Sequence, residues 1–118
     1  TIDLGESWKE HPTSRRALVE PTCMASLHRH EYMEEGKKKS MLLFVNPNNY
    51  GTRDNLTLKV SFDDGMTWPE EHWILFDQYR STGYSCITSI DENSIGILYE
   101  SSQSDLAFIK INLIEILK

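Results

Sequence analysis

Long hydrophobic runs are missing from this sequence, and none approaches the roughly 20 residues that a membrane-spanning helix needs. A basic stretch followed by an apolar one, as in a signal peptide, is also missing. Basic residues are in deficit, with 12 Lys and Arg against 18 Asp and Glu. This acidic balance argues against nucleic acid or an anionic membrane as the main partner. The aromatic content and the moderate use of Pro and Gly indicate a folded chain rather than a disordered one.

Cysteine is scarce as well. Cys23 and Cys86 each stand alone in a strand-like run, and no CxxC pair occurs. Two separate buried thiols are the simpler interpretation, and a disulfide between them is the alternative. His28 and His30 alternate on a strand but lack a third ligand at the spacing of a metal site. We therefore expect no bound metal and no cofactor.

An internal repeat is the strongest pattern that the sequence does contain. Thr1–Trp8 and Ser61–Trp68 both read hydroxyl–x–Asp–x–Gly–x–hydroxyl–Trp, with matching positions 60 residues apart. We call these segments the first and the second acidic turn. The matched residues are Asp3 and Asp63, Gly5 and Gly65, and Trp8 and Trp68.

Each residue of the acidic turns has a structural role in a hairpin connection. The Asp carboxylate accepts hydrogen bonds from N–H groups a few residues on, and the Gly provides a positive φ. The Trp is expected to start the next strand and to pack its ring under the loop. The alternative is that the acidic groups bind a cation or act in catalysis. Asp63 and Asp64 have too few ligand oxygens near them in the sequence to favour that interpretation.

Strand patterns occupy most of the remaining chain, and no convincing helix occurs. Leu56–Ser61 alternates apolar and polar residues, which predicts a half-buried strand. Leu106–Leu113 is interpreted as a strand, with a helical tail over residues 114–118 as an option. The other predicted strands are Cys23–His28, Met41–Val45, Trp73–Phe76, Tyr84–Ile90 and Ile95–Tyr99.

These patterns predict an all-β fold built as part of a β-propeller, with roughly two four-stranded antiparallel blades. The first acidic turn (1–8) precedes a full blade at about 9–78, which contains the second acidic turn (61–68). Strands within 84–118 form a closing blade. Because two blades leave sheet edges and faces exposed, we expect residues 1–118 to be one part of a longer propeller domain.

The sequence resembles the sialidases, a family with a six-bladed propeller, in which the acidic turns are known as Asp boxes or BNR repeats. Tyr50–Thr57 resembles the family's Arg-x-Asn-Leu-Thr stretch, and Gly83–Ser85 resembles the segment with the catalytic tyrosine. Gly96–Glu100 resembles the Gly-x-Leu-Tyr-Glu strand that follows. Val19–Ser26 resembles a Pro-x-Cys-x-x-Ser strand of the preceding blade. The resemblance covers essentially the whole chain and corresponds to the C-terminal part of the family's propeller.

The resemblance implies a role for three residues. Arg53 matches the last of three arginines that bind the substrate carboxylate, which suits a planar, permanently charged guanidinium. Tyr84 matches the nucleophile, and sialidases are known to use tyrosine where other glycosidases use a carboxylate. A neutral phenol is not repelled by an anionic substrate, but it needs a base and cationic surroundings to react at neutral pH. Glu100 matches a glutamate that orients one of the arginines.

The expected function is therefore a segment of a retaining exo-sialidase that removes terminal sialic acids from glycoconjugates. The family's acid/base aspartate, its first two arginines and the glutamate paired with the tyrosine match no residue here, so we expect the isolated chain to be inactive. The alternatives are a non-catalytic glycan-binding propeller and a structural one. Partners would be sialylated glycans and the remainder of the propeller, without membrane insertion. For the parent protein we expect a secreted, periplasmic or cell-surface location.

Overall fold

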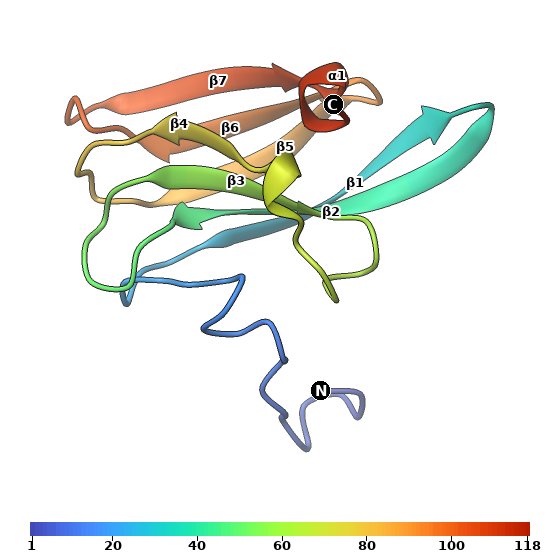
Figure 1. The fold of residues 1–118 in the computed structure, drawn as a ribbon, viewed down its shortest axis with the longest axis horizontal. Coiled ribbons are helices and arrows are strands. Elements are labelled where there is room, and N and C mark those ends of the chain that lie inside the picture. The colour runs from blue at the N-terminus through green and yellow to red at the C-terminus, as the bar shows by residue number, and fades with distance from the viewer.

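The computed structural model describes residues 1–118 as two stacked antiparallel β-sheets (Figure 1). The first sheet has the strand order β1-β2-β3-β4 and the second has the order β5-β6-β7. The strands are Ser26–Glu34 (β1), Lys37–Pro47 (β2), Leu56–Ser61 (β3), Ile74–Asp77 (β4), Ser85–Asp91 (β5), Ser94–Glu100 (β6) and Leu106–Asn112 (β7). The predicted all-β class with two antiparallel sheets is confirmed, although the second sheet has three strands rather than four.

One hydrophobic core joins the two sheets. On β2, Leu43 and Val45 are fully buried at alternate positions, as the two-residue period of a strand requires. They stand opposite Val60 and Leu58 of β3 in the antiparallel register. The core residues are Tyr32, Met41, Leu43, Val45, Leu56, Leu58, Val60, Ile87, Ile95, Ile97, Tyr99, Ile111, Leu113 and Ile116.

Strand β3 is buried on both faces, so the prediction of a half-buried strand is wrong. Its polar residues Thr57, Lys59 and Ser61 are all buried. The chain that precedes β1 contacts Lys59, whereas the Ser61 hydroxyl bonds within the second acidic turn. The Lys59 Nζ donates to the Ala17 carbonyl at 2.6 Å and lies 4.5 Å from the centre of the Trp73 ring. Burial lowers the pKa of Lys59 to about 8.

The second acidic turn leads into a short 3₁₀ helix before the next strand begins. Trp68 was expected to start that strand, and this prediction is wrong. Pro69 follows it, and the Pro69 carbonyl accepts the N–H of His72 at 3.1 Å, which closes the 3₁₀ helix η1 (Glu70–His72). Strand β4 therefore begins only at Ile74.

The predicted strand over residues 106–113 is present as β7, which ends at Asn112. The short helix α1 (Leu113–Ile116) follows it, so the optional helical tail is also present and begins one residue earlier than expected. Asn112 caps this helix: its backbone N–H donates to Glu115 Oε1 at 3.1 Å in a capping box. Ile116 is buried in the core. No helix in the structure has the length and apolar character to cross a bilayer.

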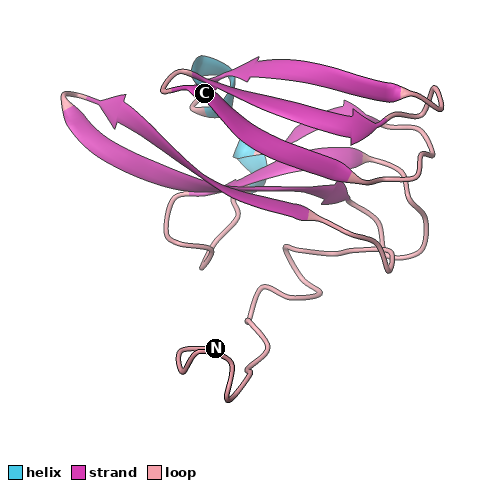
Figure 2. Cartoon of the chain, turned by 180° about the vertical axis from the view of Figure 1, so that it is seen from behind, coloured by secondary structure: helices cyan, strands magenta, loops and turns pink.

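The first acidic turn lies away from both sheets (Figure 2). The Trp8 ring contacts its own turn at Gly5, as predicted, but nothing covers its other side, and 79% of the residue is exposed. The strand expected to leave this turn is absent. Between residues 9 and 25 the only β-type pairing is the isolated bridge between Ser14 and Leu18.

Both cysteines are free thiols, so the alternative of a disulfide between them is wrong. Cys86 is exposed on β5 rather than buried, because its side chain points to the outer face of the second sheet. Cys23 is half-buried and precedes the first strand, which begins at Ser26 rather than at residue 23.

Candidate functional site

Arg53, Tyr84 and Glu100 all lie at one end of the two sheets. Arg53 comes just before β3, Tyr84 just before β5, and Glu100 is the last residue of β6. Antiparallel pairing places the start of β5 beside the end of β6, and the Glu100 N–H donates to the Tyr84 carbonyl at 3.0 Å. The Ser81 N–H donates to the Arg53 carbonyl at 2.9 Å, which ties the loop before Tyr84 to the loop before β3.

The side chains of Arg53 and Tyr84 meet. The Arg53 Cζ lies 5.5 Å from the centre of the Tyr84 ring, within the range of a cation–π contact. Tyr84 is 41% exposed, so its ring is open to solvent and to a ligand. The guanidinium also donates from Nη1 to the Thr82 carbonyl at 3.1 Å and from Nη2 to the Thr22 carbonyl at 3.3 Å. The arginine is therefore fixed beside an accessible phenol.

Glu100 does not form an ion pair with Arg53 or with any other basic residue. Its Oε2 atom is buried and has no hydrogen-bond partner within the chain. The same holds for the hydroxyl of Ser81. Both residues line a cavity of about 530 Å³ that also includes Arg80 and Thr82. A buried carboxylate oxygen without a partner is costly, and it can accept a hydrogen bond from a cationic group.

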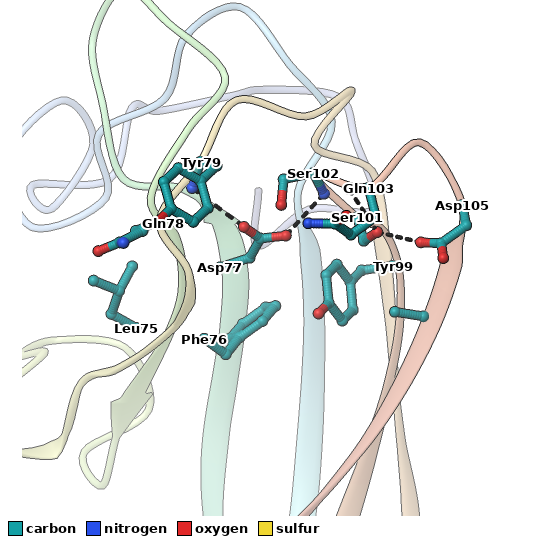
Figure 3. Close-up of a pocket in the computed structure, with 11 residues that line it drawn as sticks. Leu75, Phe76, Asp77, Gln78, Tyr79, Tyr99, Ser101, Ser102, Gln103 and Asp105 are labelled. Carbon is teal, nitrogen blue, oxygen red and sulfur yellow. Dashed lines mark hydrogen bonds between the residues drawn. The ribbon is translucent and has the colours of Figure 1, made fainter.

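A second cavity of about 510 Å³ lies at the same end of the sheets, between β4 and the turn after β6 (Figure 3). Phe76 and Tyr99 form its floor, with ring centres 4.9 Å apart in an edge-to-face contact. Asp77 accepts the N–H groups of Ser102 at 2.8 Å and Tyr79 at 3.2 Å. Burial raises the pKa of Asp77, but these hydrogen bonds outweigh it and the net shift is downward.

The Asp carboxylates of the acidic turns accept hydrogen bonds from within the turns. No group of three or more His, Cys, Asp or Glu side chains lies close enough to hold a metal ion. The Asp63 carboxylate is engaged by the Thr67 N–H at 2.8 Å, the Thr67 hydroxyl at 2.6 Å and the Ser61 hydroxyl at 2.8 Å. These bonds match the predicted turn chemistry.

The residues that surround Arg53 were not found by sequence reasoning. Thr22 and Thr82 act through backbone carbonyls, which no side-chain motif reveals. Cys23 packs between them, with its Sγ 3.7 Å from the Thr82 carbonyl oxygen. Burial raises the pKa of the Cys23 thiol, while the charge of Arg53 opposes the shift. The Pro-x-Cys-x-x-Ser resemblance around Cys23 was the one available signal that this segment belongs to the site.

Comparisons with known proteins find sialidases. A sialidase of Bacteroides fragilis (strain YCH46) is 46% identical over 118 residues, which is 100% of this chain and 22% of that protein. A sialidase of Micromonospora viridifaciens is 33% identical over 90 residues, covering 75% of this chain and 13% of that protein. The solved structure of the Hadza microbial sialidase Hz136 matches with a TM-score of 0.86 and 44% identity, over 98% of this chain and 22% of that one. No family model matches. The chain thus spans less than a quarter of the length of these proteins.

Proposed function

The chain is a segment of a sialidase propeller, and on that basis we propose that it provides the nucleophile and one substrate-binding arginine of a retaining exo-sialidase. The substrates would be glycans that end in sialic acid. The observation that carries the proposal is the contact between the guanidinium of Arg53 and the ring of the accessible Tyr84, at 5.5 Å. A carboxylate-binding cation and a phenol thus stand side by side, at one end of the sheets.

The chemistry of a sialoside explains why these two groups belong together. Its carboxylate is attached directly to the anomeric carbon, so a guanidinium that binds the carboxylate places the reacting carbon next to Arg53. The Tyr84 oxygen would attack that carbon while the glycosidic bond breaks and the leaving oxygen takes a proton from an acid elsewhere in the protein. Water then cleaves the tyrosyl–sialic acid bond, and two inversions give net retention. As the Tyr84 oxygen forms its bond to the anomeric carbon, its proton would pass to a base in the remainder of the propeller.

Glu100 is proposed to orient a further arginine of the substrate carboxylate site. The support is its buried Oε2, which has no partner among residues 1–118 and borders the 530 Å³ cavity. A guanidinium from the remainder of the propeller would satisfy this oxygen. The acid/base aspartate, the glutamate paired with the tyrosine and two arginines would also come from the remainder. Because these groups would come from the remainder, we expect the isolated chain to be inactive. We also expect the complete protein to be secreted, periplasmic or at the cell surface.

The test is a pair of tyrosine substitutions in the full-length protein. Tyr84→Phe removes the nucleophile and is expected to lower kcat on a fluorogenic sialoside by roughly a thousandfold or more. Tyr79→Phe is the matched control, because Tyr79 is an exposed tyrosine of the same loop that contacts the neighbouring cavity. It should retain wild-type kcat.

Two outcomes would contradict the proposal. Wild-type turnover by Tyr84→Phe would show that this tyrosine is not the nucleophile. Sialoside binding without turnover by the wild-type full-length protein would favour a non-catalytic glycan-binding propeller. The 118-residue chain assayed alone should show no turnover.

A further inference from the structure

Two backbone carbonyls hold the guanidinium of Arg53 from opposite segments of the chain. Nη2 donates to the carbonyl of Thr22, just before β1, and Nη1 donates to the carbonyl of Thr82, just before β5. A guanidinium has five N–H groups, and these two contacts leave the others free for a substrate carboxylate. The direction of the free N–H groups is therefore set by the two peptide groups that carry the carbonyls.

Thr22 adopts a backbone conformation that needs support. Its φ is 54°, and it is the only β-branched residue among the seven non-glycine residues with positive φ. The left-handed region is strained for a β-branched residue, and such strain persists only where the surroundings impose it. In this conformation the Thr22 carbonyl points at the guanidinium of Arg53.

Glu20 supplies that support. Its Oε2 accepts the backbone N–H of Cys23 at 2.8 Å. The Cys23 N–H and the Thr22 carbonyl belong to one planar peptide group and point in opposite directions. The Glu20 carboxylate therefore fixes the plane from one side, while the carbonyl on the other side contacts Arg53. A hydrogen bond to the N–H also polarises the peptide group and strengthens its carbonyl as an acceptor.

The second peptide group is held by packing. Gly83 follows the Thr82 carbonyl with φ of 88°, and a Cβ there would lie 2.8 Å from Pro47 Cγ and 3.2 Å from Cys23 Sγ. Only glycine fits this backbone position. The segment before β1 and the segment before β5 thus contact each other at Cys23 and Thr82, and both bond to Arg53.

We propose that Glu20 is a positioning residue for substrate binding and acts on Arg53 through the peptide group between Thr22 and Cys23. This inference rests on the proposed function, because it takes the ligand of Arg53 to be a substrate carboxylate. Glu20 does not touch the substrate. The carboxylate is bound in both the ground state and the transition state, so disturbing Arg53 weakens binding in both and raises KM with little change in kcat.

The experiment compares Glu20→Ala and Glu20→Gln in the full-length protein. Glu20→Ala removes the acceptor for the Cys23 N–H and is expected to raise KM for a fluorogenic sialoside about tenfold, with kcat changed less than about threefold. Glu20→Gln keeps an acceptor oxygen and should restore a KM near that of the wild type. Glu10→Ala is the matched control, because Glu10 is an exposed carboxylate of the same N-terminal segment that pairs with Arg15 at 3.7 Å.

A second readout separates positioning from a general loss of structure. An unsaturated sialic acid analogue and its neutral amide are compared as inhibitors, because only the acid carries the charge that Arg53 binds. The wild-type preference for the acid should shrink about tenfold in Glu20→Ala and persist in Glu20→Gln. If Glu20→Ala does not fold, Glu20→Asp takes its place, because the shorter carboxylate loses reach and should show the same changes in smaller degree.

The outcomes distinguish this inference from the proposed function. Equal weakening of both inhibitors in Glu20→Ala, or an unchanged KM, would overturn the positioning role of Glu20 while leaving the proposed function intact. A wild-type protein that neither cleaves the sialoside nor binds the acid inhibitor would overturn both.

Discussion

The first and the second acidic turn have the same internal hydrogen bonds. In the first, the Asp3 carboxylate accepts the Ser7 N–H at 3.0 Å and the Ser7 hydroxyl at 2.6 Å. In the second, Asp63 accepts the Thr67 N–H at 2.8 Å and the Thr67 hydroxyl at 2.6 Å. In both turns the tryptophan Nε1 donates to the glycine carbonyl at 3.1 Å. The agreement extends to the glycine backbone, with φ of 99° in one turn and 90° in the other.

The surroundings of the two turns differ completely. Trp8 is 79% exposed, whereas Trp68 is 6% exposed and packs edge-to-face on Phe44 of β2 with ring centres 5.9 Å apart. Every side-chain hydrogen bond of the first turn stays within residues 1–8. The second turn is also held from outside, by an ion pair between Asp64 and Arg29 of β1. Eight residues thus suffice to specify the turn, while its burial depends on the neighbouring strands.

Removing each tryptophan gives the largest expected contrast between the turns. Trp68→Ala should lower the free energy of unfolding by about 3–5 kcal/mol, because it leaves a cavity against Phe44. Trp8→Ala should change it by no more than about 0.5 kcal/mol, as for other exposed residues. Urea unfolding of the 118-residue chain measures both values.

A comparable loss for the two substitutions would show that Trp8 packs against the sheets in solution. The comparison is sharpened by repeating Trp8→Ala in the full-length protein. A larger loss there would indicate that the remainder of the propeller covers the first turn as β2 covers the second.

Acid should weaken the two turns in different ways. The Thr67 hydroxyl and N–H and the Ser61 hydroxyl lower the pKa of Asp63 from 3.8 to about 2, and the equivalent bonds lower the pKa of Asp3 as well. A carboxyl with a lowered pKa binds its proton more weakly in the folded chain than in the unfolded one. Its stabilisation is therefore complete above about pH 4 and is lost as the pH falls toward 2.

Only the second turn is coupled to the sheets, so only Asp63 should affect global unfolding. Asp63→Asn should reduce the loss of stability between pH 4 and 2, and Asp3→Asn should leave it unchanged. Urea unfolding across this pH range tests the first point, and NMR titration of the carboxyl carbons tests both pKa shifts. An ordinary pKa for Asp63 would contradict the hydrogen bonding of the turn.

The sequence was informative wherever structure depends on neighbours along the chain. The hydrogen bonding within the acidic turns and the strand over Met41–Val45 depend on local sequence, and both could be predicted. The burial of Lys59 could not be predicted, because it depends on a contact with Ala17, which is 42 residues away along the chain. The exposure of Trp8 could not be predicted either. The pattern of the first turn predicts a packed ring, but whether strands cover that ring depends on the rest of the fold.

In the candidate site too, the residues within short sequence patterns could be predicted, whereas those that act through the backbone could not. Arg53, Tyr84 and Glu100 could be nominated because they belong to short segments of recognisable pattern. The positive φ of Thr22 could not, because nothing in a threonine indicates a left-handed backbone. Glu20 was equally hidden, since its contact is with a backbone N–H and becomes meaningful only once the Thr22 carbonyl is seen beside Arg53.

The smallest expected effect on stability comes from the ion pair that only the second turn forms. Arg29 Nη2 lies 2.8 Å from Asp64 Oδ1, with both side chains largely exposed. Leu4 occupies the equivalent position of the first turn with nearly the same φ, 59° against 58°, so the charge is not needed for the turn itself. Asp64→Asn keeps a residue that tolerates a left-handed backbone and removes only the charge. It should cost about 0.2–1 kcal/mol in urea unfolding at low salt and almost nothing in 1 M NaCl. A cost that persists in high salt would mean that Asp64 stabilises the second turn by something other than its charge.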